Sequence, residues 1–195
     1  MTALLFDLDG VVMRPRTDSD RLRIERAAGA TDPEAFWDVY KELRPAYEAG
    51  DVSDYRWWQQ VGLRAGLDDP DIAEAIVADW ESATVVNDEI VEILEKLREA
   101  DYTCGIVANV TETIGDKLRS KYAWIDALDA VIFSCDIGIT QPDPRAYEVA
   151  VDALGANLKD TIYFTANPDH LASAREAGLQ ARPFTSIKDV HDLQL

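Results

Sequence analysis

The chain has 195 residues, of which 47% are hydrophobic and 29% charged, a balance that excludes wholesale disorder and fits a globular protein. Its 19 basic and 37 acidic residues give a formal net charge of -18, which disfavours nucleic acid and anionic membranes as partners. Two cysteines, Cys104 and Cys135, are too few for a disulfide framework or a cysteine metal site, so we expect buried thiols.

The first part of the chain predicts a strand followed by a long helical stretch. An apolar strand is expected at about residues 2–8. Pro33 and Pro70 each follow an aspartate and precede apolar residues at helical spacing, which is typical of a capped helix with proline in its first turn. We therefore predict that residues 14–84 form an all-helical cap, inserted into a core made of residues 1–13 and 85–195.

The rest of the chain alternates strands and helices. The predicted strands are 102–109, 130–135, 161–165 and about 180–184; the predicted helices are near 111–120, 143–154 and 168–177, with a last short helix within 186–195. This alternation indicates an α/β fold, with a Rossmann-like parallel-sheet core covered by helices on both faces. The N-terminal apolar run ends before Asp7 and follows no basic segment, so we expect neither a signal peptide nor a membrane span. We assign the protein to the cytoplasm by default.

Two carboxylates, Asp7 and Asp9, stand beside Gly10 at the end of the first strand. Residues two apart on an extended strand point the same way, and ligands of parallel sheets bind beyond the carboxyl ends of the strands. Two carboxylates there can hold a metal ion, or can divide the roles of nucleophile and general acid. The competing interpretation is a pair of aspartates that only stabilises a turn.

The run FDLDGVV resembles the first motif of the haloacid dehalogenase superfamily, most of whose members are magnesium-dependent phosphohydrolases. Three further stretches are similar to its second, third and fourth motifs: IVANVTET, ITQPDPRAYEVAVDALG and YFTANPDHLASAREAGLQA. The resemblance covers essentially the whole chain. It implies the phosphatase-like branch of the superfamily, with a Rossmann-like core and a small helical cap.

The resemblance also implies a role for each matching residue. Asp7 would attack phosphorus to form an aspartyl phosphate, and Asp9 would protonate the leaving oxygen and later activate water. A small phosphorylated substrate would be bound by Gly10, Asn109 and Gln141. A Mg²⁺ cofactor would be held by Asp7, Asp9 and Asn167.

Three positions depart from the pattern of the superfamily. Ala108 stands in place of a hydroxyl group, Gln141 in place of a lysine, and Thr165 with Ala166 in place of an acidic pair. Losing a single preorganised donor or charge in an active site typically lowers the rate on the order of 10² to 10³. We therefore expect an impaired phosphatase. The candidates to replace the missing groups are Asn167 or Asp169 as a metal ligand and Arg14, Arg16 or Arg145 as a cation.

Two other functions stay open. The first alternative is a noncatalytic descendant that keeps the fold and binds a ligand or a partner. The second follows from the run of residues 165–167, which is similar to the metal-independent 2-haloacid dehalogenases, although Asp9 stands where that branch has tyrosine and Gln141 lacks its lysine. His170 is expected near the cleft in the first turn of a helix, where an incidental polar role is preferred over catalysis.

Overall fold

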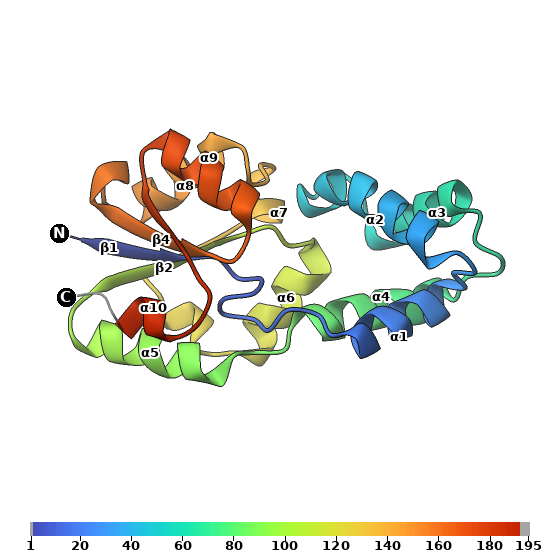
Figure 1. The fold of residues 1–195 in the computed structure, drawn as a ribbon, viewed down its shortest axis with the longest axis horizontal. Coiled ribbons are helices and arrows are strands. Elements are labelled where there is room, and N and C mark those ends of the chain that lie inside the picture. The colour runs from blue at the N-terminus through green and yellow to red at the C-terminus, as the bar shows by residue number, and fades with distance from the viewer. Residues whose placement is uncertain (1, 192–195) are drawn as a thin grey trace.

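The computed structural model describes residues 2–191. Figure 1 shows a sheet with helices on both faces at one end of the molecule and the helices α1 to α4 at the other. The strands are β1 (Ala3–Phe6), β2 (Thr103–Ala108), β3 (Ala130–Phe133), β4 (Thr161–Thr165) and β5 (Gln180–Pro183). The helices are α1 (Asp18–Ala28), α2 (Pro33–Glu48), α3 (Asp54–Ala65), α4 (Ile72–Ala83), α5 (Asp88–Glu99), α6 (Glu112–Lys121), α7 (Ser134–Ile137), α8 (Pro144–Ala153), α9 (Pro168–Ala177) and α10 (Lys188–His191), with 3-10 turns η1 (Ile125–Ala127) and η2 (Leu158–Asp160).

All five strands are parallel and follow the order β3-β2-β1-β4-β5, so β1 lies at the centre. Successive residues of a strand point to opposite faces. Leu4 and Phe6 pack in the core that contains residues of α5, α6 and α10, whereas Leu5 packs in the core that contains residues of α8 and α9. A strand buried on both faces must be apolar throughout, as β1 is. The predicted α/β fold is confirmed.

The third strand is shorter than the sequence predicts. Phe133 ends β3, because the next residues turn into α7, which closes at Gly138 with a left-handed φ of +67°. The expected strand over residues 130–135 is therefore wrong in its last two positions. Cys104 is buried in β2 as expected, but Cys135 in α7 is only half-buried. Of the predicted C-terminal helix within 186–195, α10 is present, and residues 192–195 lie outside the described residues.

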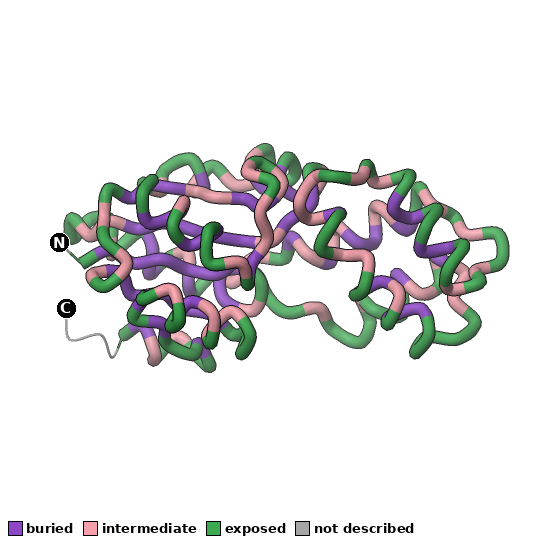
Figure 2. The backbone as a smooth tube through the Cα atoms, turned by 90° about the horizontal axis from the view of Figure 1, so that it is seen from above, coloured by how far each residue is buried: buried purple, intermediate pink, exposed green. Residues whose placement is uncertain are grey.

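Helices α1 to α4 lie within residues 14–84, which we call the helical insertion, and they pack around an apolar core of their own. Its largest fully buried side chains are Trp57, Trp58 and Phe36. Figure 2 shows buried backbone both along the strands and on these helices. The two connections to the sheet pair with each other, because Arg14 N donates to Val85 O over 2.8 Å. The division of the chain into a core domain and a cap domain stays a prediction.

The insertion is also fixed against the carboxyl edge of the sheet. Ser134 Oγ donates to the carbonyl of Glu48, and Thr113 Oγ1 donates to Asp54. Gly50 has a φ of +78°, and a Cβ atom there would lie 3.1 Å from the carbonyl oxygen of Cys135. The end of α2 therefore sits directly on α7, beside the edge where ligands of parallel sheets bind.

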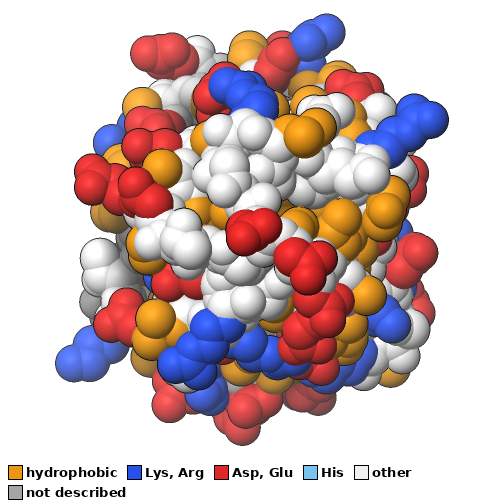
Figure 3. Space-filling view, turned by 90° about the vertical axis from the view of Figure 1, so that its right-hand side faces the viewer, with side chains coloured by type: hydrophobic (Ala, Val, Ile, Leu, Met, Phe, Trp, Pro, Cys, Tyr) orange, Lys and Arg blue, Asp and Glu red, His pale blue; other side chains and the backbone are white. Residues whose placement is uncertain are grey.

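The far end of the helical insertion faces the viewer in Figure 3. The middle of this face is mostly uncharged, and separate groups of acidic and basic side chains lie around it. Within residues 2–191, no helix combines the length and the apolar character needed to cross a bilayer.

Candidate active site

Asp7 occupies the first position beyond the central strand. Its N–H donates to Phe164 O over 2.8 Å, so it continues the ladder beside β4 by one residue. The chain then turns back, and Met13 N donates to Leu8 O over 2.7 Å. Asp9 therefore lies in this turn, beyond the strand predicted over about residues 2–8, which ends at Phe6. Both nevertheless line the same cavity, because the turn folds back over the end of β1.

The Asp7 carboxylate is buried, with 3% of its surface exposed, and is held by four polar groups. Its Oδ2 accepts hydrogen bonds from Tyr163 Oη at 3.0 Å and Thr165 Oγ1 at 2.6 Å, and it lies 2.9 Å from His170 Nδ1. Its Oδ1 accepts only from Leu8 N, at 2.9 Å. These contacts fill the acceptor capacity of Oδ2 and fix the rotamer, so Oδ1 is the oxygen left to act on a ligand.

Gln141 supports this carboxylate from behind. Its Nε2 donates to Tyr163 Oη over 2.6 Å, and Tyr163 Oη in turn donates a hydrogen bond to Asp7 Oδ2. Burial, followed by the negative charge of Asp7, raises the pKa of Tyr163 well above its usual value, so the phenol stays protonated. The backbone of Gln141 is clamped by Asn109, which donates to its carbonyl and accepts from its N–H, each over 2.8 Å.

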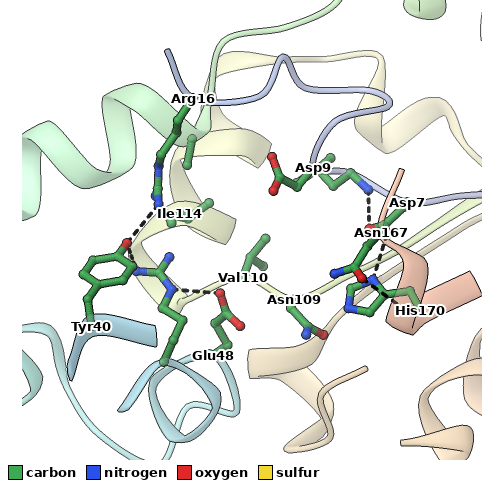
Figure 4. A pocket seen from close by; sticks show the side chains of 13 residues that line it. Asp7, Asp9, Arg16, Tyr40, Glu48, Asn109, Val110, Ile114, Asn167 and His170 are labelled. Carbon is green, nitrogen blue, oxygen red and sulfur yellow. Dashed lines mark hydrogen bonds and ion pairs between the residues drawn. The ribbon is translucent and has the colours of Figure 1, made fainter. Parts of the chain in front are cut away.

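A cavity of about 300 Å³ opens in front of Asp7, between the sheet and the helical insertion. In Figure 4, Asp7, Asn167 and His170 lie on one side, and Arg16, Tyr40 and Glu48 lie on the other. Four of the predicted site residues line the cavity: Asp7, Asp9, Asn109 and Asn167.

Two predicted substrate-binding residues do not line this cavity. Gln141 is buried, with 3% exposed, and its amide is used by Tyr163. Gly10 has a φ of +72°, and a Cβ atom there would lie 3.0 Å from the Cβ of Ala166. Its role is to let the turn pass close to the end of β4. Direct contact of these two residues with a substrate stays a prediction.

Asp9 is open to the water in the cavity but has protein on most sides. This partial desolvation raises the pKa of its carboxyl group; the positive charge of Arg16 acts against the rise, and the negative charge of Asp7 adds to it. Asp9 therefore keeps its proton to a higher pH than a free aspartate does. A protonated carboxyl group beside a carboxylate can donate a proton to a leaving group.

The residues present do not make a complete magnesium site. Among residues 2–191, no three His, Cys, Asp or Glu side chains lie close enough together to hold a metal ion. Asn167 caps α9, and its Oδ1 accepts from the N–H groups of Asp169 at 2.9 Å and His170 at 3.4 Å. His170 also contacts Asp7 Oδ2, so the protein itself uses Asp7 Oδ2 and Asn167 Oδ1, and Asp7 Oδ1 and Asp9 are left of the predicted metal ligands.

Of the three predicted substitute cations, one reaches the cavity. Arg14 is exposed and lies 4.0 Å from Asp88, and Arg145 is exposed and pairs with Asp143. Arg16 lines the cavity. Sequence reasoning missed a second cavity arginine, Arg44, although its spacing of four from Tyr40 places both on one face of α2.

These arginines belong to an arginine cluster, which comprises Arg16, Tyr40, Arg44, Glu48 and Asp79. Asp79 Oδ1 accepts from Arg16 Nη2 at 2.6 Å, and Oδ2 accepts from Arg44 Nη1 at 2.9 Å. Tyr40 Oη accepts from Nη1 of Arg16 at 3.0 Å and of Arg44 at 2.6 Å, and it donates to Asp79. Glu48 accepts from Arg44 Nε at 2.8 Å.

The two carboxyl groups of the cluster differ in their ionisation. Burial alone would raise the pKa of Asp79, but the charges of Arg44 and Arg16 and the hydrogen bond from Tyr40 lower it overall. Burial raises the pKa of Glu48, and its neighbour Arg44 only partly opposes the rise. Asp79 is therefore the fixed anion that holds both guanidinium groups in place.

Residues 1–178 match the haloacid dehalogenase-like hydrolase family. The chain belongs to this family. Validoxylamine A 7'-phosphate phosphatase from Streptomyces hygroscopicus subsp. limoneus is 24% identical to it over 196 residues, which cover 97% of this chain and 88% of that protein. (S)-2-haloacid dehalogenase 4A from Burkholderia cepacia is 34% identical over 91 residues, which cover 45% of this chain.

The fold is shared with a HAD family enzyme from Bacteroides thetaiotaomicron, solved as a magnesium complex. The TM-score is 0.81 at 15% identity, with 98% of each chain covered. The match to the Burkholderia dehalogenase spans 38% of that protein's length, and a match to a Mycobacterium tuberculosis phosphatase spans 41%. Relatives of this chain therefore include both phosphatases and dehalogenases, and its reaction has to be argued from its own site.

Proposed function

We propose that this HAD-like hydrolase cleaves small phosphomonoesters slowly, through a covalent intermediate on Asp7. Asp7 Oδ1 attacks phosphorus, the bond from phosphorus to the leaving oxygen breaks, and Asp9 gives its proton to that oxygen, so that an alcohol leaves. A water molecule then attacks the aspartyl phosphate and gives a proton to Asp9. The bond from phosphorus to Asp7 breaks, and inorganic phosphate is released.

The observation that supports this reaction best is that one cavity is lined by both Asp7, whose Oδ1 accepts only one hydrogen bond, and Asp9, whose pKa is raised. An alkoxide is a poor leaving group that needs a proton, whereas a halide leaves without one. A retained general acid therefore favours ester cleavage over dehalogenation. Slow turnover is expected because Gln141, which has no charge, and Ala108, which has no hydroxyl group, stand at the positions where the resemblance implies a lysine and a hydroxyl residue.

Positive charge for the substrate would come from the helical insertion, which we propose acts as a cap over the cavity. Arg16 and Arg44 line the wall that faces Asp7, and their guanidinium groups match the geometry of anionic oxygens. Magnesium, when bound, neutralises charge on a transferring phosphoryl group. The acidic residues that could hold it here are Asp7 and Asp9, which fit a weak site at most, and no step above depends on it.

The proposal is tested by phosphate release from a panel of phosphomonoesters, measured with excess magnesium and with a chelator. Asp7→Asn should abolish turnover and the phosphorylated protein that acid quenching traps in the wild type. Asp88→Asn is the matched control, because Asp88 is an exposed aspartate outside the cavity. Turnover that survives Asp7→Asn would overturn the mechanism.

The pH dependence tests the role of Asp9 separately. The protonated acid is needed, so the rate should fall as the pH rises through the pKa of Asp9, which lies above the ordinary value of 3.8. Asp9→Asn should be slow at every pH and should lack this limb of the profile. A profile that Asp9→Asn does not change would assign the limb to another group.

The same protein preparations discriminate the two alternatives. The hydroxyl that Thr165 donates to Asp7 is the observation that favours dehalogenation, and release of halide from 2-haloacids that depends on Asp7 would establish it. If neither phosphate nor halide is released in an Asp7-dependent manner, the noncatalytic binding role is the remaining function.

A further inference from the structure

Arg44 keeps unused hydrogen-bond donors at the wall of the cavity. A guanidinium group has five N–H donors. The Nε of Arg44 donates to Glu48, and its Nη1 donates to Tyr40 and to Asp79. Neither N–H of its Nη2 has an acceptor among the described residues, and this atom is not fully buried. Two donors on a fixed cation are therefore available to a ligand.

Arg16 adds to this surface from the chain segment that leads into α1. Its Nε donates to Ser82 over 2.9 Å, its Nη1 to Tyr40 over 3.0 Å, and its Nη2 to both Oδ1 and the carbonyl of Asp79. One N–H on Nη1 has no acceptor within residues 2–191. Figure 4 shows that Arg16 and Tyr40 stand across the cavity from Asp7.

The rigidity of this arrangement distinguishes it from ordinary surface charge. Side-chain exposure is 12% for Arg44 and 23% for Arg16, and both are tied to Asp79, whose side chain is 3% exposed. The Arg44 guanidinium carbon also lies 5.1 Å from the centre of the Tyr40 ring. A cation held in this way loses little conformational freedom when it binds an anion.

The size and charge of the cavity limit what can bind there. A volume of about 300 Å³ is at the small end of ligand sites, so the occupant is a compact molecule. One end of the cavity holds the reacting Asp7, and the opposite wall holds two guanidinium groups. The three free N–H donors match the two oxygens of a carboxylate, which can accept about four hydrogen bonds.

We propose that Arg16 and Arg44 form a carboxylate-binding subsite and that the substrate is a small phosphorylated organic acid. Its phosphate reacts at Asp7, which rests on the proposed function, and its carboxylate binds the guanidinium groups of the cap. Arg16 and Arg44 are thus specificity-determining residues, and a phosphate ester of similar size without the carboxylate is a poor ligand.

The experiment compares 3-phosphoglycerate with glycerol 3-phosphate, which has the same skeleton with a hydroxymethyl group in place of the carboxylate. Binding is measured by calorimetry in the Asp7→Asn background, where the ligand cannot react. We expect 3-phosphoglycerate to bind about 10- to 100-fold more tightly, because hydrogen bonds to charged groups are strong. Adding Arg44→Gln should bring the two affinities together. Adding Arg64→Gln is the control, because Arg64 is an exposed arginine of α3 that pairs with Glu42 outside the cavity.

Equal affinities of the two ligands in the Asp7→Asn protein, or binding of neither, would overturn the subsite whatever Arg44→Gln does. If Arg44→Gln does not fold, Arg44→Lys keeps a positive charge for Asp79 while removing the free Nη2, and it should also reduce the preference. A preference retained in folded Arg44→Lys would argue against the assignment. This binding test is independent of turnover, so a chain that hydrolyses nothing can still confirm or refute the subsite.

Discussion

Replacing Asp79 with asparagine should destabilise the helical insertion strongly. Asp79 is 2% exposed, and its two oxygens accept from Arg16, Tyr40 and Arg44. Asparagine has nearly the same shape, but it carries no charge, and its NH₂ group would face donors where Asp79 presents an acceptor. Two guanidinium groups would then be left without their shared anion, in a place that water reaches poorly.

The magnitude follows from the burial of the group. Removing one partner of a buried ion pair lowers the free energy of unfolding by about 3–5 kcal/mol. In a domain of about 150–250 residues, each kcal/mol lowers Tm by about 2–4 °C, so Asp79→Asn should lower Tm by about 6–20 °C. Glu48→Gln is the matched control, because Glu48 pairs with the same Arg44. Burial raises the pKa of Glu48, and glutamine can still accept from Arg44, so about 1 kcal/mol or less is expected.

Thermal melting followed by circular dichroism measures both variants. The pKa of Asp79 is lower in the folded protein than its ordinary value of 3.8. Its stabilisation is therefore fully present above that value and is lost as the pH falls through the lower, folded pKa. The Tm difference between wild type and Asp79→Asn should be constant from about pH 5 to 7 and should narrow only in stronger acid. A loss no larger than that of Glu48→Gln would refute this account of the arginine cluster.

Three further outcomes are expected. Gly105→Ala should lower the free energy of unfolding in urea by about 1–3 kcal/mol, because the added Cβ would lie 2.8 Å from Ala130 O. Gly62→Ala is the control and should be neutral or stabilising, because its Cβ would lie 3.7 Å from the nearest atom. Equal effects of the two substitutions would contradict this packing. Burial raises the pKa of Cys104 to about 12, so this thiol should resist a thiol reagent at pH 8 until the protein unfolds. Burial raises the pKa of the half-buried Cys135 to about 11, so it should react slowly. Rapid labelling of Cys104 in the native protein would be inconsistent with its burial. Combining Ala108→Ser, Gln141→Lys and Ala166→Asp should raise phosphate release at least about tenfold, because a donor, a cation and a carboxylate are added near Asp7; an inert but folded variant would place the defect in the cap or in the cleft shape.

Local patterns were sufficient for the architecture. The strand β1 is apolar at every position, and β4 is apolar at its three central positions between two threonines, because both faces of a parallel sheet are covered; this requirement is visible in the sequence. One predicted helix start was readable for a similar reason, because Asp32 before Pro33 caps its own helix through a contact three residues away. The other was wrong in detail: Pro70 precedes Asp71, the cap of α4, and does not lie in the first turn.

Part of the site was also accessible from the sequence. Asp7 follows an apolar strand directly, and the carboxyl edge of a parallel sheet is where ligands bind, so its position in the cavity could be predicted. Asp9 was predicted at the same site as well, but the structure places it in the turn that follows β1. The turn depends on how closely Gly10 approaches Ala166, which no local pattern encodes.

What the sequence determined by itself is therefore the order of the elements and the presence of a carboxylate at the end of the central strand, because these depend on neighbours within a few residues. The tertiary structure decided which groups surround that carboxylate. His170 contacts Asp7 across 163 positions, and Arg44 pairs with Asp79 across 35. Tertiary packing also explains why Gln141 does not line the cavity: Tyr163 of β4 lies between the Gln141 amide and Asp7. Such contacts form only when separate elements pack together, and packing depends on the shapes of all the surfaces involved.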